Sequence, residues 1–147
     1  MLRLTQLAAL VILVFAGASC RSPIDRIAES HIEGNVPKGN LFDEYLKRDL
    51  EQYFCKEREK CAVEYELLRK GPTQTGIAYP KFYLWVKTVE GQIILSEGAI
   101  RVAAIDQKGF EITDFLSREE ILNSPFKVGS VFPAALVDKI MSKARPQ

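Results

Sequence analysis

Apolar and polar residues first alternate with a helical period, over residues 41–57. The apolar positions recur every three or four residues: Phe42, Tyr45, Leu46, Leu50, Tyr53 and Phe54. The positions between them are mostly charged, so a helix here would bury one face and expose the other. Asn40 precedes this segment and is a favoured N-cap residue. The pattern predicts a long amphipathic helix over residues 41–57, capped by Asn40.

Beyond residue 60 the apolar residues alternate with polar ones, the period of half-buried β-strands. Strands are predicted over 61–70, over 81–87, after the tight turn Glu90–Gly91, and over 110–115. The side chains expected to face the helix are Val63, Tyr65, Leu67, Phe82, Leu84, Val86, Ile100, Val102, Ala104, Phe110 and Ile112. Because the connections are short, the four strands are expected to form an antiparallel meander.

The third of these strands changes parity along its length. A two-residue turn at Glu90–Gly91 would direct Leu95, Glu97 and Ala99 toward the helix, whereas Ile100 and the apolar residues after it occupy the opposite parity. One extra residue corrects such a mismatch, and a glycine is a favourable place for it. We therefore expect a one-residue bulge at Glu97–Gly98 and a strand bent near Gly98.

A capping signal marks the start of a short helix after the sheet. Ser117 and Glu120 have the spacing of a capping box, and Leu116 and Ile121 have the spacing of a hydrophobic staple. The sequence Asn-Ser-Pro at 123–125 is expected to end this helix.

The segment after Pro133 predicts a C-terminal helix, with Leu136 and Ile140 on one face. One long helix, four strands and C-terminal helices together predict an α+β domain whose sheet curls around the first helix. This order resembles the cystatin-like and NTF2-like folds. The Gln-x-Val-x-Gly signature of inhibitory cystatins is absent, so the resemblance implies no function.

The first twenty residues have the layout of a secretory signal. Arg3 is followed by an apolar stretch over 4–15, which is shorter than the roughly 20 residues of a membrane-spanning helix. The sequence Ala-Gly-Ala-Ser-Cys at 16–20 resembles the lipobox of bacterial lipoproteins, although leucine is commonest where Gly17 stands. An ordinary signal peptide and an uncleaved anchor are the alternatives.

The lipobox resemblance implies a lipid anchor on Cys20. The thiol would carry a diacylglyceryl group, and cleavage would follow Ser19. The new amino terminus would then be acylated, and palmitate is an expected acyl chain. Several acyl chains hold a protein durably to a bilayer, whereas one does not. Arg21 stands where an aspartate would favour retention in the inner membrane. The resemblance therefore implies an outer-membrane lipoprotein that faces the periplasm.

Three regions are predicted from these signals: a cleaved signal over 1–19, a lipidated N-terminus and tether over 20–40, and a single domain over 41–147. A short amphipathic helix with Pro23 at its first position is expected in the tether, ending at Gly34. The pattern leaves open whether this region packs on the domain. Without residues 1–19 the chain has 19 basic and 19 acidic side chains, which argues against binding to nucleic acid.

Cys55 and Cys61 are the cysteines that remain after Cys20. In an oxidising compartment a structural disulfide between them is the favoured interpretation, with free thiols and a redox pair as alternatives. His31 is the single histidine and lies in the predicted tether. We therefore expect no metal site, no cofactor and no catalytic triad.

One predicted strand face combines aromatic and cationic residues, and we treat it as the candidate binding surface. Its members are Lys81, Tyr83, Trp85, Lys87 and Arg101. Aromatic rings beside cations can stack on sugars or bind a protein partner. The alternative is that a terminal helix covers the rings. Glu64 and Glu66 are expected to pair with Lys81 and Lys87 across the sheet rather than to act as catalytic carboxylates.

These observations favour a non-catalytic, membrane-anchored envelope lipoprotein that binds a protein or a peptidoglycan or glycan partner. One alternative is a periplasmic inhibitor or immunity-type protein that blocks a hydrolase, through the loop over 69–80. Another is a small-molecule or enzymatic pocket inside the curled sheet, which a polar cavity containing Asp114 or Tyr45 would indicate.

Overall fold

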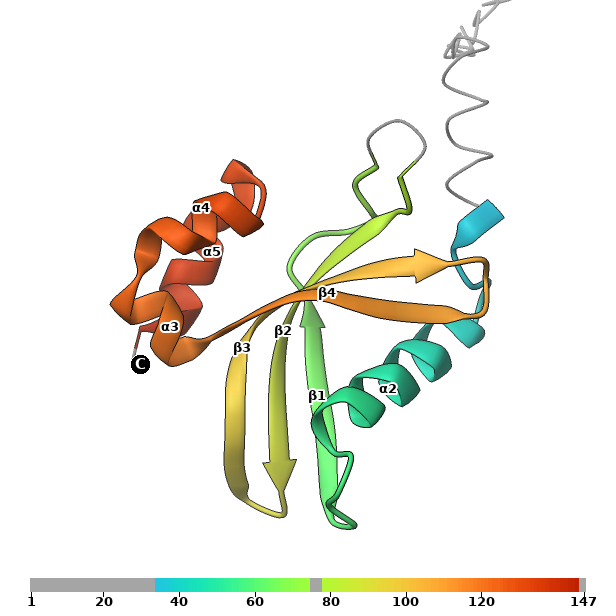
Figure 1. The fold of residues 1–147 in the computed structure, drawn as a ribbon, viewed down its shortest axis with the longest axis horizontal. Helices are drawn as coiled ribbons and strands as arrows, with labels where there is room; N and C mark the ends of the chain where they lie inside the picture. Colours follow the sequence, from blue (N-terminus) through green and yellow to red (C-terminus); the bar gives the residue numbers. More distant parts are fainter. Residues whose placement is uncertain (1–33, 75–77, 146–147) are drawn as a thin grey trace, which may run out of the picture.

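The computed structural model describes residues 34–74 and 78–145. Its elements are α2 (Leu41–Phe54), β1 (Cys61–Leu67), β2 (Lys81–Glu90), β3 (Ile93–Ile105), β4 (Gly109–Ser117), α3 (Arg118–Asn123), α4 (Pro125–Val131) and α5 (Ala134–Ala144). The strands form one antiparallel sheet in the order β1-β2-β3-β4. Figure 1 shows α2 beside the sheet on one side and the three C-terminal helices grouped together on the other. The predicted α+β class is confirmed.

The sheet separates two apolar clusters. Phe82, Leu84 and Val86 of β2 pack with Leu46 and Leu50 of α2, in a cluster that also includes the predicted inward residues of the other strands. Tyr83 and Trp85 point to the opposite face and pack with residues of α3, α4 and α5. Because both faces are covered, six of the ten residues of β2 are buried, including the unbroken run Phe82–Val86, and side chains of this strand contribute to both clusters.

Helix α2 begins where expected but is not capped as expected. The Asn40 side chain makes no capping hydrogen bond, and its backbone is helical with φ −65° and ψ −22°. An N-cap residue normally has an extended backbone that directs its side chain toward the first free N–H groups, so this conformation explains the difference. The helix ends at Phe54 rather than at residue 57. Directly after it, the predicted disulfide between Cys55 and Cys61 is present and confirmed.

The change of parity in β3 occurs at Leu95. Thr88 pairs with Ser96 and Val89 pairs with Ile94, so Leu95 is the extra residue. The predicted bulge at Glu97–Gly98 is therefore wrong, because the mismatch is corrected closer to the turn. Figure 1 shows that β3 curves along its length. The part near the turn pairs only with β2, and the later part also pairs with β4.

Gly98 has a different reason to be glycine. A Cβ atom at this position would overlap the carbonyl oxygen of Leu116 and would lie 2.9 Å from the Cα atom of Ser117. The strand β4 therefore approaches the β3 backbone closely at their last paired position, which is Gly98 opposite Ser117.

The predicted capping box at the start of α3 is confirmed. The backbone N–H of Glu120 donates to Ser117 Oγ at 3.2 Å, and the backbone N–H of Ser117 donates to Glu120 Oε2 at 3.0 Å. Leu116 and Ile121 are buried in the same apolar cluster, as a hydrophobic staple requires. These contacts set the direction in which the chain leaves the sheet.

The last two helices cover the outer face of the sheet. In α5, Leu136 and Ile140 are buried as predicted. Helix α4 was not predicted, because Pro125 was interpreted only as the end of the preceding helix, whereas it occupies the first turn of a new one. Val128 is its buried residue.

Contacts with the domain begin before residue 41. The backbone N–H of Gln107 donates to the Asn35 carbonyl at 2.9 Å, and the Gln107 side chain donates to the Gly34 carbonyl at 2.8 Å. Val36 packs against the cluster on the α2 side. The end of the predicted tether therefore belongs to the folded unit. The signal, Cys20 and the tether up to residue 33 lie outside the described residues.

Candidate binding surface

Tyr83 and Trp85 are covered by the C-terminal helices. Their exposed fractions are 5% and 4%. The Tyr83 ring meets Phe132 edge-on, with a centroid distance of 6.1 Å, and its hydroxyl shares a 2.5 Å hydrogen bond with Thr73 Oγ1. The structure thus has the covered arrangement, and these rings are not accessible for stacking on a sugar. The cause is the apolar face of α5, which buries Leu136 and Ile140 against them.

The three cations of the predicted surface, Lys81, Lys87 and Arg101, make contacts with different parts of the fold. Arg101 forms an ion pair with Asp114 and donates to the Val131 carbonyl at 3.0 Å, which ties β3 and β4 to the end of α4. Lys81 is partly buried, and its backbone pairs with Thr73. Only Lys87 lies near Trp85 in a polar network. The five residues therefore do not form one continuous exposed surface.

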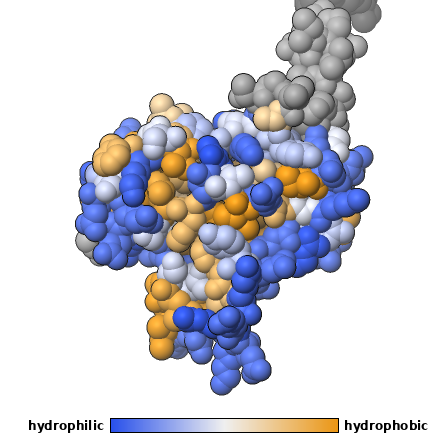
Figure 2. Space-filling model, in the orientation of Figure 1, coloured by the Kyte–Doolittle hydropathy of each residue, from blue (hydrophilic) through white to orange (hydrophobic). Residues whose placement is uncertain are grey.

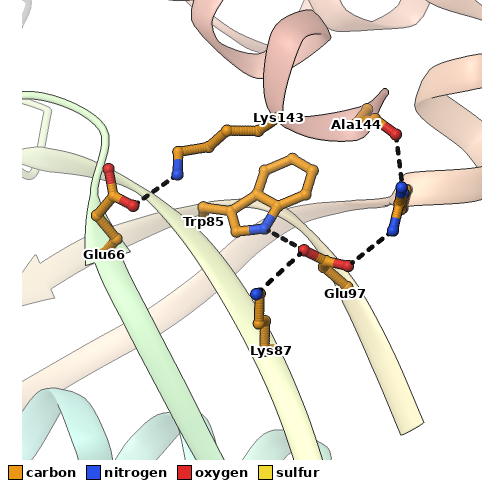
Figure 3. A network of polar contacts seen from close by, with 7 residues as sticks. Glu66, Trp85, Lys87, Glu97, Lys143 and Ala144 are labelled. Carbon is orange, nitrogen blue, oxygen red and sulfur yellow. Dashed lines mark hydrogen bonds and ion pairs between the residues drawn. The ribbon is translucent and has the colours of Figure 1, made fainter. Parts of the chain in front are cut away.

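Glu97 is the centre of this network, which Figure 3 shows from close by. Its carboxylate is 11% exposed and accepts a 2.8 Å hydrogen bond from Trp85 Nε1. Arg118 Nη1 lies 3.2 Å from the second oxygen, and Lys87 Nζ lies 3.7 Å from the first. Arg118 also donates from Nε to the Ala144 carbonyl at 2.8 Å. Two cations thus share one carboxylate.

Glu66 forms the second part of the network, between β1 and α5. Lys143 Nζ donates to its carboxylate at 2.6 Å, and Lys139 Nζ lies 3.6 Å from the other oxygen (Figure 3 shows the contact with Lys143). The hydrogen bond from Lys143 holds the pKa of the Glu66 carboxyl below its ordinary value. Lys139 additionally donates to the Leu68 carbonyl at 3.0 Å.

The predicted pairing of Glu64 and Glu66 with lysines of the next strand is wrong. Glu64 stands opposite Lys87 in the sheet register, but the Lys87 ammonium pairs with Glu97 instead. Glu66 stands opposite Trp85 and pairs with the lysines of α5. For Glu66 the reason is that α5 lies over this face and brings Lys139 and Lys143 within reach.

Two hollows flank the network. The first has a volume of about 410 Å³ and is lined by Glu64, Tyr65, Glu66, Trp85, Lys87, Ile94, Glu97, Arg118, Lys143 and Arg145. The second has a volume of about 510 Å³ and is lined by Ile94, Leu95, Ser96, Glu97, Ser117, Arg118, Glu119, Leu122 and Asn123. Ile94, Glu97 and Arg118 line both, so the hollows meet at these side chains.

Aliphatic side chains are exposed beside these hollows. Ile93 is 66% exposed and Ile94 is 53% exposed, whereas Leu122 and Leu95 are exposed to 42% and 36%. Figure 2 shows apolar colour at the lower left of the molecule, where the hairpin between β2 and β3 projects, and a further apolar area in the middle of this face. Sequence reasoning treated this stretch only as the start of a strand. The sequence contains a signal for this exposed patch. Three consecutive aliphatic residues follow a tight turn, at a place where the side chains on one face of a strand are expected to be polar.

The inside of the curled sheet is not a polar cavity around Asp114 or Tyr45. Apolar side chains fill the space between α2 and the sheet. Asp114 pairs with Arg101, and the Arg48 guanidinium lies 4.5 Å from the centre of the Tyr45 ring. Within residues 34–74 and 78–145, no cluster of three or more potential metal-ligating side chains occurs, and no helix is long and apolar enough to cross a membrane.

A scan of the chain against protein-family models found no match, and searches of curated proteins and of solved structures found none either.

Proposed function

We propose that this chain is a non-catalytic envelope lipoprotein, anchored through Cys20, that binds a protein partner with the surface around the β2–β3 hairpin. The anchor is supported by the lipobox-like sequence at 16–20. The disulfide between Cys55 and Cys61 supports the oxidising side of a membrane, because such bonds persist there and are rare in the cytosol.

The observation that carries the binding function is the exposure of Ile93, Ile94 and Leu95 in a row. Exposed aliphatic residues that adjoin one another mark interaction sites more often than isolated ones do. A glycan partner is less well supported than a protein, since the rings of Tyr83 and Trp85 that would stack on a sugar are buried.

The position of the hairpin suits a tethered binding protein. In Figure 1 the chain enters the described domain at the upper right, at residue 34, and the hairpin projects at the lower end. The hairpin and the residue at which the described domain begins thus lie at opposite ends of the molecule in this view.

The anchor is tested by mass spectrometry of the mature protein from its native envelope. The proposal expects a chain that starts at Cys20 and carries the mass of a diacylglyceryl group and a further acyl chain. The Cys20→Ala variant should lose this modification and its membrane fraction. An unmodified mature chain that starts at another residue would contradict the anchor.

The partner is tested by crosslinking in intact cells. We expect a discrete protein adduct that Ile93→Asp reduces by about tenfold, the effect of losing roughly 1.4 kcal/mol of binding free energy. Phe126→Asp is the matched control, because Phe126 is 78% exposed and lines neither hollow. An adduct that both variants reduce equally, or no adduct at all, would contradict binding at the hairpin.

A further inference from the structure

Residues 93–97 of β3 are paired on one side only. Ile93, Ile94, Ser96 and Glu97 pair with β2, whereas β4 pairs with β3 only from Gly98 onward. The chain turns away into α3 at Arg118, directly after Ser117. Within the described residues no strand pairs with the other edge, so the backbone N–H and C=O groups on that side have no strand partner.

The second hollow occupies the position that a longer β4 would have filled. Ser96 and Glu97 line it from β3, and Ser117, Arg118 and Glu119 line it from the end of β4 and the start of α3. A five-residue strand spans roughly 17 Å. Ile94, Leu95 and Leu122 supply apolar walls for the side chains of such a strand.

We propose that an extended peptide segment of the partner adds to this edge as a fifth strand, beside residues 93–97. Main-chain hydrogen bonds would give such a complex its affinity, and the pockets for alternate side chains would give it specificity. The inference rests on the proposed function for the existence of a protein partner, but it does not depend on the lipid anchor.

The N–H groups of Arg118 indicate which side chain the segment carries. Lys87, Arg118, Lys143 and Arg145 line the two hollows together with Glu64, Glu66, Glu97 and Glu119, so the lining charges are equal in number. Arg118 is 37% exposed and retains N–H groups beyond those that contact Glu97 and Ala144. The segment is therefore expected to combine aliphatic residues with one acidic residue that reaches Arg118.

A peptide segment fits this edge better than a second copy of the chain does. A stable interface between two proteins buries about 1,200–2,000 Å². The free edge is five residues long and α3 flanks it, so a second sheet would have to approach past the same helix.

The test uses the full acylated chain in detergent and a random ten-residue peptide library. Selected peptides are synthesised, and binding is followed by the fluorescence of Trp85, the single tryptophan of the chain, whose indole N–H donates to Glu97 in the lining of the second hollow. We expect peptides with alternating aliphatic residues and one acidic residue, and slower hydrogen exchange of the amides in 93–97. Peptides whose backbone nitrogens are methylated at every second residue, on the edge that would pair with β3, should bind about tenfold more weakly or worse.

Two substitutions complete the test. Ile94→Lys should weaken peptide binding about tenfold, whereas Phe126→Lys should change it less than about twofold. No enrichment of peptides, equal affinity of the methylated peptides, or protection of amides elsewhere would overturn strand addition. If Ile93→Asp loses the cellular adduct but methylated and unmethylated peptides bind with equal affinity, the partner binds this surface without adding a strand. If the mature chain carries no lipid but peptides bind tightly, only the anchor is rejected.

Discussion

Gly98 lies where the backbone of β4 leaves no room for a side chain on β3, and this allows a specific prediction at the scale of a single residue. A Cβ atom there would overlap the Leu116 carbonyl, which is backbone and cannot rotate away. Gly98→Ala should therefore lower the free energy of unfolding by about 1–3 kcal/mol, the usual effect of overpacking. Urea denaturation followed by circular dichroism measures it.

Gly129→Ala is the matched control for this prediction. Gly129 lies inside α4, and a Cβ atom there would meet nothing within 4 Å. Alanine in an exposed helix interior is favoured over glycine, so this variant should be about 0.5–1 kcal/mol more stable than the wild type. Equal midpoints for the two variants would show that β4 does not approach β3 as described.

At the scale of elements, the ion pairs of Glu66 attach α5 to β1 in addition to the apolar contacts. Because the pKa of Glu66 is lower in the folded state, the carboxylate contributes stability above its unfolded pKa, and this contribution disappears as the pH falls through the folded pKa. Glu66→Gln should thus be less stable than the wild type near pH 7, by less than about 1 kcal/mol since the side chain is half exposed.

The difference between Glu66→Gln and the wild type should shrink as the pH is lowered from 6 to 3, a range that brackets the ordinary carboxyl pKa of about 4.3. Thermal unfolding across this range measures it. Glu64→Gln serves as the control, because Glu64 forms no ion pair in the described part of the chain. A constant deficit of Glu66→Gln at every pH would show that the ion pairs do not contribute.

At the scale of the whole molecule, the disulfide joins the end of α2 to the start of β1. Closing the loop over 55–61 restricts the unfolded chain and contributes about 2.4 kcal/mol by the chain-entropy relation. The double variant Cys55→Ser and Cys61→Ser should therefore unfold at lower temperature and lower urea concentration.

Chemical reduction is the control for the disulfide prediction. A reducing agent should bring the wild type to the thermal midpoint of the double variant and should leave the midpoint of the double variant unchanged. If reduction leaves the midpoint of the wild type unchanged, the bridge does not stabilise the fold.

Several parts of this organisation were predictable because they depend on neighbours in the chain. The stripe around Leu46 and Leu50, the alternation around Leu84 and the Ser117 capping box are local patterns, and each is present. Local signals were insufficient where two outcomes have similar patterns. Asn40 has the chemistry of a cap but the wrong backbone conformation, and Pro125 can end one helix or start the next.

The amino-acid sequence alone predicted the α+β class and the inward faces of the strands, because hydrophobic periodicity does not depend on distant contacts. It also favoured the pairing of Cys55 with Cys61, because these are the cysteines that remain after Cys20. Only the tertiary structure decided that α5 buries Trp85, that Glu66 pairs with Lys143, and that residues 93–97 keep a free edge. Each of these depends on where a segment distant in sequence packs. The choice between a covered ring and an exposed one, or between a cross-strand lysine and a helical one, is made by that packing.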